Sequence, residues 1–483
     1  MIPKEINFLV VAPAVILTLT GFVVLLLGLF LPKISRQVKI FLALAGLACA
    51  ALFTIEAWNT FAVTFGGMIS ADNFAITFNC IFLVGAGLSL LLSLNEYEMG
   101  YLLYAEFSTV LLFATVGMVL MAATTNLLIL FLGLETLSIS LYVLAGIKRN
   151  EVRSLEASFK YFLLGAFASG FLLYGIAFLY GATGTLDLRV IAKMLTSANN
   201  VLNHPLLILG GLLVVVGLGF KVSMFPFHMW APDVYQGAPT PITAFMSTGS
   251  KAAGFAAMLR VLFSTTNGTS PDWVTILWVI AVLTMFIGNI AALVQTNIKR
   301  MLAYSSIAHA GYILIGLVAW NGVGRASVIF YLLSYTFMNI GAFGIVAFLG
   351  KKEQENLDID DFKGLAFRKP FIAILMAIFM FSLAGLPPTS GFFGKFYLFS
   401  AAVSSGHVPL VILGVINSMI SVYYYLGVVV VMFMKESEKP LALPGRLPAV
   451  SSSLIIAGLG TLGLGIFPSY WIKMFEYVIN TMV

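Results

Sequence analysis

The chain has 483 residues, of which 60% are hydrophobic and only 10% are charged, with a formal net charge of +6. Soluble domains carry about 25% charged residues, so this composition excludes a soluble globular protein and indicates an integral membrane protein. The basic surplus is explained by membrane topology, as described below, so nucleic-acid binding is not expected.

Regularly spaced apolar segments predict about fourteen transmembrane helices and therefore an all-α integral membrane protein. Most connections between them are short, so we expect a single polytopic membrane domain. It would comprise helices 1–3 in residues 1–100, a first repeat in 101–263, a second repeat in 273–433 and a C-terminal helix in 451–481. The predicted spans are 6–31, 38–58, 72–94, 101–123, 126–147, 157–180, 205–229, 240–263, 273–296, 301–319, 326–349, 370–404, 408–433 and 451–481.

Fourteen spans place successive connections on alternating faces of the membrane. Sixteen lysines and arginines fall on one face, six fall on the other, and four lysines lie within the spans, which accounts for all 26. Cytoplasmic connections carry the excess of lysine and arginine, so the first face is predicted to be cytoplasmic. Both termini are then expected on the outer face.

The lysines within the apolar spans are Lys160, Lys221, Lys251 and Lys395, and the fifth span holds an acid, Glu135. A charge at the bilayer centre costs about 2.5–3.5 kcal/mol, so such residues usually have a function. Glu135, Lys221 and Lys251 are predicted to lie deep in the membrane, whereas Lys160 is near the start of its span and could extend to the cytoplasmic face. The alternative role is a buried Glu–Lys pair that only specifies helix packing.

Lysine suits proton transfer because desolvation lowers its pKa towards neutrality. At an effective dielectric constant of about 20, a carboxylate opposes that shift by roughly 4 kcal/mol at about 4 Å and by roughly 1.7 kcal/mol at about 10 Å. A small movement of Glu135 relative to a lysine would therefore change the proton affinity of the lysine. His228 and His309 could relay protons, or could be neutral histidines that satisfy polar neighbours.

Two spans are predicted to be discontinuous, the seventh near Pro226 and the twelfth near Pro387 and Pro388. Proline removes a backbone donor and clashes with the preceding turn. Broken backbone at membrane depth persists only inside protein or beside a wet cavity. Because the two interrupted spans are five apart, we expect two inverted five-helix repeats, spans 4–8 and 9–13.

The two cysteines, Cys49 and Cys80, lie in separate apolar spans. They form neither a C-x-x-C pair nor a ligand set for an iron–sulfur cluster. We therefore expect no cofactor and no metal in this chain, and any redox centre should belong to another protein.

Two long motifs surround the predicted breaks. They are FKVSMFPFHMWAPDVYQGAPTP at residues 220–241 and GLPPTSGFFGKF at residues 385–396. Both resemble signatures of the antiporter-like subunits of respiratory complex I, the proton-pumping NADH:quinone oxidoreductase. The nearest branch is subunit N, which is related to chloroplast and cyanobacterial subunit 2, and the resemblance extends over essentially the whole chain.

The resemblance implies a translocase subunit with fourteen helices, inverted repeats and a proton path along a central polar axis. It implies partners among the other membrane subunits, including sister antiporter-like subunits, within a bacterial inner membrane. NADH, FMN, iron–sulfur clusters and quinone would then bind to partner subunits. The residues that match the proton path, with Lys160 the least secure, are Glu135, Lys160, Lys221, His228, Lys251, His309 and Lys395.

Two departures from sister subunits favour subunit N. Residues 246–251 read MSTGSK, whereas subunits L and M and the multisubunit cation/proton antiporters carry a His-Ser-Ala-Thr-Met-Val-Lys pattern there. Lys395, in place of a glutamate, argues against subunit M. The alternatives are a subunit of a sodium/proton antiporter and a scaffold whose charges only hold neighbouring subunits together.

Overall fold

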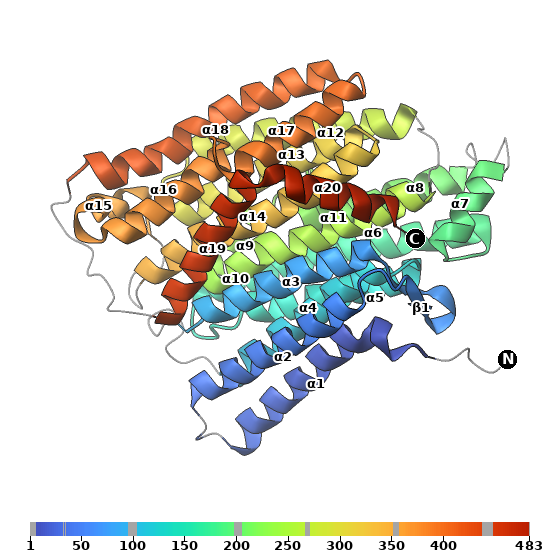
Figure 1. Ribbon diagram of the computed structural model, residues 1–483, viewed down its shortest axis with the longest axis horizontal. Coiled ribbons are helices and arrows are strands. Elements are labelled where there is room, and N and C mark those ends of the chain that lie inside the picture. The colour runs from blue at the N-terminus through green and yellow to red at the C-terminus, as the bar shows by residue number, and fades with distance from the viewer. Residues whose placement is uncertain are drawn as a thin grey trace.

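The computed structural model describes residues 6–31, 33, 35–94, 104–197, 205–265, 271–350, 357–436 and 448–482. Most of these residues are helical, because a bilayer leaves backbone N–H and C=O groups no partner outside a helix or a closed barrel. The long helices lie side by side in one bundle (Figure 1). The multi-pass α-helical membrane fold predicted from the sequence is therefore confirmed.

Within the described ranges, 12 helices are long and apolar enough to cross a membrane. They match twelve of the predicted spans to within a few residues at most ends. Their bounds are α1 Phe8–Phe30, α2 Arg36–Glu56, α3 Asn73–Leu92, α4 Tyr104–Ala123, α5 Leu127–Ala145, α6 Val152–Thr183, α8 Pro205–Val222, α12 Pro271–Leu293, α13 Ile298–Val318, α14 Gly322–Leu349, α18 Val408–Met434 and α19 Pro448–Ile466.

The other two predicted spans are assembled from shorter helices. Residues 240–265 form α10 (Thr240–Phe245), the π-helical segment η3 (Met246–Ser250) and α11 (Lys251–Thr265). Residues 370–404 form α16 (Pro370–Ala384) and α17 (Ser390–Ser404). The widened π turn ends directly before Lys251, and such turns are frequent at functional sites.

Both predicted interruptions are present. Helix α8 ends at Val222, and irregular chain leads to the short helix α9 (Ala231–Gly237). Helix α16 ends at Ala384 and is capped by Gly385, which has φ 88° and ψ 45°, a conformation that favours glycine. A Cβ at this position would also lie 3.2 Å from Nζ of Lys395. The break in the twelfth span therefore shapes the space that the lysine occupies.

The C-terminal region differs from the prediction of one helix over 451–481. Helix α19 ends at Ile466, and a separate amphipathic helix, α20 (Pro468–Asn480), follows. Pro468 lacks the backbone donor needed to continue α19, so the chain turns there. Helix α20 then packs on α14 and α3. A further amphipathic helix, α7 (Leu188–Ser197), was not predicted.

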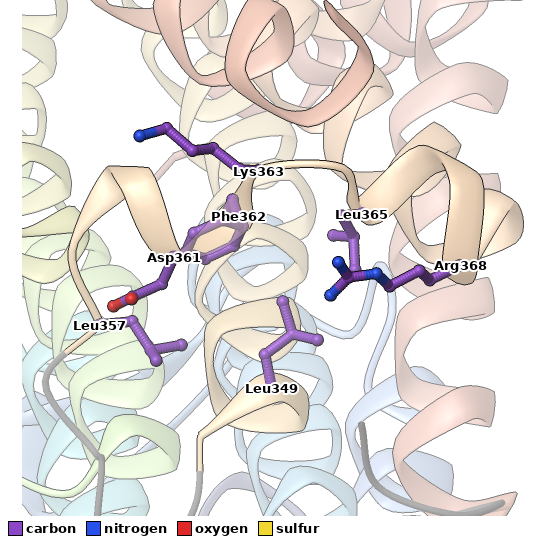
Figure 2. Close-up of a pocket in the computed structure, with 7 residues that line it drawn as sticks. All are labelled: Leu349, Leu357, Asp361, Phe362, Lys363, Leu365 and Arg368. Atoms are coloured by element: carbon purple, nitrogen blue, oxygen red, sulfur yellow. The ribbon is translucent and has the colours of Figure 1, made fainter. Parts of the chain in front are cut away.

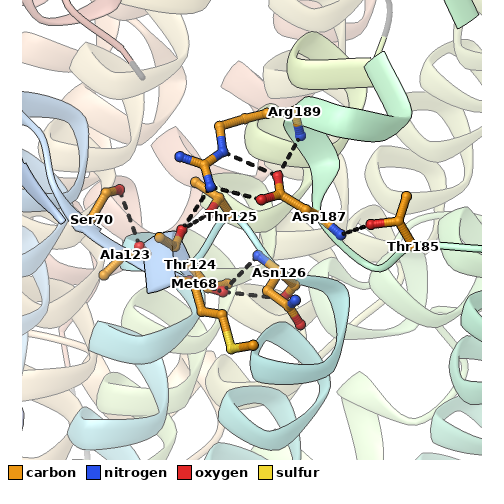
Figure 3. Close-up of polar contacts among 10 residues, drawn as sticks. Met68, Ser70, Ala123, Thr124, Thr125, Asn126, Thr185, Asp187 and Arg189 are labelled. Carbon is orange, nitrogen blue, oxygen red and sulfur yellow. Dashed lines mark hydrogen bonds and ion pairs between the residues drawn. The ribbon is translucent and has the colours of Figure 1, made fainter. Parts of the chain in front are cut away.

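The start of α5 is held by a set of backbone bonds that we call the Asn126 clasp. Figure 3 shows the polar contacts around it, among them Arg189 bound to Asp187. Asn126 pairs with Asp187 in an antiparallel bridge. The amide of Leu127 donates to the carbonyl of Leu186, and the amide of Leu188 donates to Thr125, each at 2.9 Å. The clasp thus joins the first turn of α5 to the chain that enters α7.

The start of α13 is held in the same way by the Asn297 clasp. Asn297 pairs with Asp358 in an antiparallel bridge, and Ile298 donates to the carbonyl of Leu357 at 3.1 Å. The amide of Ile359 donates to Thr296 at 2.8 Å. The two partners are 61 residues apart in each clasp (126 to 187 and 297 to 358), and the clasps are 171 residues apart (126 to 297).

A hairpin of β1 (Ala62–Thr64) and β2 (Ile69–Ala71) lies at the end of the bundle that holds the Asn126 clasp. The amide of Asn7 donates to Thr64 at 3.1 Å, and Asn73 donates to the hydroxyl of Thr481 at 3.1 Å. The first and last described segments therefore lie on the same face of the bundle.

A fully buried ion pair lies near this hairpin. Arg260 of α11 binds both carboxylate oxygens of Asp72 at 2.6 Å, and both side chains are 0% exposed. Nε of Arg260 also donates to the carbonyl of Ala122, and its guanidinium lies 4.7 Å from the ring centre of Phe74. Asp72 caps α3, Phe74 lies in α3 and Ala122 lies in α4, so the pair joins α11 to α3 and α4.

Candidate functional site

Lys221 lies in the last turn of α8, directly before the first break, and is only 3% exposed. Its ammonium donates to the hydroxyl of Ser138 on α5 at 2.9 Å and reaches the hydroxyl of Tyr161 on α6 at 3.4 Å. The ring of Tyr161 stacks on the ring of Trp230, with ring centres 4.4 Å apart. Trp230 follows the break in the chain, so residues on both sides of the break position the Tyr161 ring. Neutral hydroxyls therefore bind this lysine.

Glu135 lies on α5 and is half-buried. Its carboxylate accepts a hydrogen bond from Ser169 of α6 and interacts electrostatically with Lys221. Among the described residues, no ion pair within 4.0 Å joins Glu135 to a lysine. The predicted acid and base are thus brought near each other without direct contact.

Lys251 begins α11 and is 1% exposed. Its ammonium donates to the backbone carbonyl of Ser306 on α13 and lies 2.5 Å from the hydroxyl oxygen of the same residue. It also lies 5.6 Å from the ring centre of Tyr335. Ser250, the preceding residue, places a buried hydroxyl next to Tyr161 but beyond hydrogen-bond distance.

His309 lies in the middle of α13 and is 1% exposed. Its Nδ1 is 2.5 Å from the hydroxyl of Tyr331 on α14, and its Nε2 is 2.9 Å from the hydroxyl of Tyr425 on α18. Tyr425 also shares a hydrogen bond with Ser305. Both ring nitrogens are therefore occupied by tyrosine hydroxyls, and the ring of Tyr335 lies 5.1 Å from the imidazole.

Lys395 of α17 is 4% exposed and fills the second break. It donates to the carbonyls of Leu383 at 3.2 Å and Ala384 at 2.9 Å, and to the hydroxyl of Ser418 at 2.9 Å. These carbonyls belong to the last turn of α16, which has no further amide to bind them. The ring of Tyr312, 4.7 Å from the ammonium, separates the lysine from His309.

Two predicted residues lie apart from this row. His228 is half-buried in the irregular chain after α8, and its Nδ1 has no hydrogen-bond partner among the described residues. Lys160 has a side chain that is 41% exposed and is paired with Glu156 at 2.7 Å and Asp233 at 2.8 Å. The structure therefore favours the alternative given in the sequence analysis, in which the side chain of Lys160 extends to the surface.

Five tyrosines between the lysines were not predicted from the sequence. All have fully buried side chains: Tyr161, Tyr312, Tyr331, Tyr335 and Tyr425. The hydroxyls of Tyr161, Tyr331 and Tyr425, together with serine hydroxyls, line the row from Lys221 to Lys395. Tyr335 contributes only its ring, because its hydroxyl forms no hydrogen bond among the described residues. The one sequence feature that could have indicated them is a tyrosine in an apolar span that needs no polar group. This feature is a weak signal, because the chain has 18 tyrosines.

The described residues contain no group of three or more His, Cys, Asp or Glu side chains that could hold a metal ion. A small pocket lies at the end of α14, against η4 (Ile359–Phe362) and α15 (Leu365–Arg368), and Asp361, Lys363 and Arg368 are among its lining residues (Figure 2). None of the predicted site residues lines it.

Residues 124–421 match the family model described as NADH:quinone oxidoreductase/Mrp antiporter, TM. The chain is also 48% identical to the NADH-quinone oxidoreductase subunit N of Trichlorobacter lovleyi, over 99% of this chain and 98% of that protein. The chain belongs to this family. The matched region includes every residue predicted for the proton path, from Glu135 to Lys395.

Solved structures agree with this assignment. A chain of respiratory complex I from Thermus thermophilus, solved with bound aureothin, aligns with a TM-score of 0.81 and 36% identity over 95% of this chain and 98% of that chain. A chain of the Mrp complex from Dietzia sp. aligns with a TM-score of 0.83 over 97% of both chains. Its identity of 21% shows a shared fold alone.

Proposed function

We propose that this chain is the proton-translocating subunit N of a NADH:quinone oxidoreductase, and that it couples electron transfer in other subunits to proton movement through its own bundle. The observation that carries the proposal is the buried row of Lys221, Lys251, His309 and Lys395, which is lined by serine and tyrosine hydroxyls. Four ionisable side chains at membrane depth are costly without a function. The 48% identity to a subunit N supports the same conclusion.

The proton path begins at Glu135 and Lys221. Redox chemistry elsewhere in the complex changes the separation of this acid and base, and so changes the proton affinity of Lys221. The proton then passes by Lys251 and His309 to Lys395, the release site. His228 and Lys160 contribute at the cytoplasmic side, where Lys160 is in contact with Asp233.

The proposed path runs through two inverted repeats, in residues 101–263 and 273–433. The two clasps support this arrangement, because they have the same bonding pattern and the same spacing of 61 residues. With the predicted topology, the Asn126 clasp faces outwards and the Asn297 clasp faces the cytoplasm. Opposite faces are what an inversion requires.

The proposed setting is the inner membrane of a bacterium, with both termini outside. The two ends of the described chain lie on one face, which agrees with an even number of crossings. NADH, FMN, iron–sulfur clusters and quinone would bind to partner subunits, and the sister antiporter-like subunits would adjoin this one. The surplus of basic residues on the predicted cytoplasmic face supports the orientation.

Purification and transport together test the proposal. We expect the tagged chain to co-elute with flavin and iron–sulfur proteins, and the complex in liposomes to pump protons on addition of NADH and quinone. Lys221→Ala or Glu135→Ala should sharply lower both quinone reduction and pumping while the assembled complex remains. Sodium/proton exchange by this chain with partners that lack redox centres would instead establish the antiporter alternative. Loss of the whole complex in both variants would indicate a structural Glu–Lys pair.

A further inference from the structure

His309 is surrounded by more hydrogen-bonding groups than a proton path between lysines requires. The imidazole is fully buried, and each ring nitrogen has its own tyrosine hydroxyl, on α14 and on α18. A neutral imidazole has one N–H donor and one acceptor nitrogen, whereas a hydroxyl can both donate and accept. The pair of hydroxyls therefore satisfies the ring in either neutral tautomer.

The same pair also satisfies the protonated ring. When the free nitrogen takes up a proton, both nitrogens become donors, and the hydroxyl that had donated to the free nitrogen rotates and accepts instead. Loss of a proton from either nitrogen restores a neutral ring with both bonds intact. Each ring nitrogen therefore keeps a hydrogen bond in every protonation state. A buried polar atom without a hydrogen bond would cost about 1–3 kcal/mol.

We propose that Tyr331 and Tyr425 are positioning residues of the proton path, which hold His309 so that either ring nitrogen can take up or release a proton. This inference rests on the proposed function. Tyr425 extends the arrangement, because its hydroxyl also shares a hydrogen bond with Ser305, one turn before His309 on α13. Tyr331, on the opposite side of the ring, lies on α14, whose Tyr335 ring adjoins Lys251.

Tyr335 provides a matched control within the same site. It lies one turn from Tyr331 on α14, it is fully buried, and its ring centre is 5.1 Å from that of His309. Its hydroxyl lies near Ser306, and it forms no hydrogen bond of acceptable geometry with any described group. Replacement by phenylalanine therefore removes an oxygen in the same surroundings without removing a bond to the imidazole.

The test uses the whole complex in liposomes, with Tyr331→Phe, Tyr425→Phe and Tyr335→Phe compared. We expect Tyr331→Phe and Tyr425→Phe each to lower the coupled rate at least about tenfold, since general acid–base partners contribute about 10²–10⁴-fold, and Tyr335→Phe to stay within about twofold. The double variant should be no slower than the slower single variant, because both hydroxyls serve one ring.

The solvent deuterium isotope effect on turnover separates a proton-handling role from packing. It should rise in Tyr331→Phe and Tyr425→Phe, because transfer through His309 becomes rate-limiting, and stay unchanged in Tyr335→Phe. Equal rates in all three variants, or a lower rate with an unchanged isotope effect, would overturn the inference. If His309→Gln and Lys395→Ala still abolish pumping in that case, the proposed function stands and only the role of the tyrosines fails. Normal pumping by those two variants would contradict the proposed proton path itself.

Discussion

The two halves of the bundle share a framework but differ in their chemistry. Counted from the clasps, Glu135 and Ser306 are each nine residues after the capping asparagine, and Ser138 and His309 are each twelve residues after it. The first half therefore has an acid where the second half has a serine, and a serine where the second half has a histidine. Neutral hydroxyls bind Lys221 in the first half as well, but among the described residues a carboxylate acts on the lysine in that half alone. The second half binds its ionisable groups with hydroxyls and backbone carbonyls.

We propose that this difference gives each half a separate task. In the first half, Glu135 is half-buried and can respond to a neighbouring subunit, so this half suits the loading of protons. In the second half, His309 and Lys395 are enclosed by tyrosines and by carbonyls freed at the break, so this half suits transfer and release. The four predictions below test or refine the comparison, beginning with the largest expected effect.

Lys395→Ala and Lys395→Arg should both abolish most coupled pumping, with a loss of roughly 100-fold or more. Alanine has no ionisable group and leaves the carbonyl of Leu383 without its Lys395 donor, whereas arginine stays charged, so neither residue can release a proton. Proton uptake by the assembled complex in liposomes measures the effect. Lys363→Arg, at a half-exposed ion pair with Asp360, is the matched control and should be near normal. Normal pumping with arginine at position 395 would show that only a fixed charge is needed.

Ser306→Asp should slow turnover by roughly tenfold or more, because a carboxylate at about 4 Å favours the charged lysine by roughly 4 kcal/mol. The change gives the second half the acid of the first half, next to Lys251. Ser306→Ala removes the hydroxyl without adding charge and should have a smaller effect. Stopped-flow proton release and steady-state turnover measure both. If the two variants are equally slow, the missing acid is not what distinguishes the halves.

Asn126→Ala and Asn297→Ala should each lower stability by about 1 kcal/mol, because each removes the side-chain cap of its helix. The side chain of Asn126 accepts from Leu128 at 2.9 Å, and that of Asn297 accepts from Arg300 at 3.1 Å. Thermal unfolding of the purified complex measures the loss. Similar losses would support the shared framework, and a loss confined to one clasp would argue against it.

Asp233→Asn should have the smallest effect, at most about 1 kcal/mol, because its ion pairs lie at the surface. Burial raises the pKa of Asp233, but hydrogen bonds from Lys160 and Arg300 outweigh burial and place the pKa below its usual value. The carboxylate therefore contributes its full stabilisation above the ordinary pKa of about 3.9 and loses it as the pH falls through the lowered value. Thermal unfolding of both proteins should differ at neutral pH and converge in acid. A difference that persists in acid would contradict this assignment.

The sequence predicts the framework and the ionisable residues well. Apolar length identifies the spans, and proline at membrane depth identifies both breaks, because each has a strong local cause. Lys221, Lys251 and Lys395 stand out as charges in apolar segments. Lys160 shows that a charge in an apolar segment is not always buried. Its side chain is paired with Asp233, which lies 73 residues away and cannot be identified as a partner from the sequence.

The rest of the site depends on contacts that no local pattern encodes. Tyr331 and Tyr425 have a role only because α14 and α18 meet around His309. Arg260 resembles an outer-face cation in sequence, yet its partner Asp72 is 188 residues away and both side chains are buried. The turn at Pro468 was missed because the apolar run continues beyond it, although proline is itself a local signal.

The hydrogen bond between Asn73 and Thr481 also has a consequence for the order of assembly. The two residues are 408 positions apart, so Thr481 is made long after α3 has entered the membrane. At about 5–20 residues per second, synthesis of the intervening chain takes roughly 20–80 s. During that time Asn59 is the partner of the Asn73 side chain, and the second hydrogen bond of its amide is still missing. Completion of α20 therefore supplies a late contact at this end of α3.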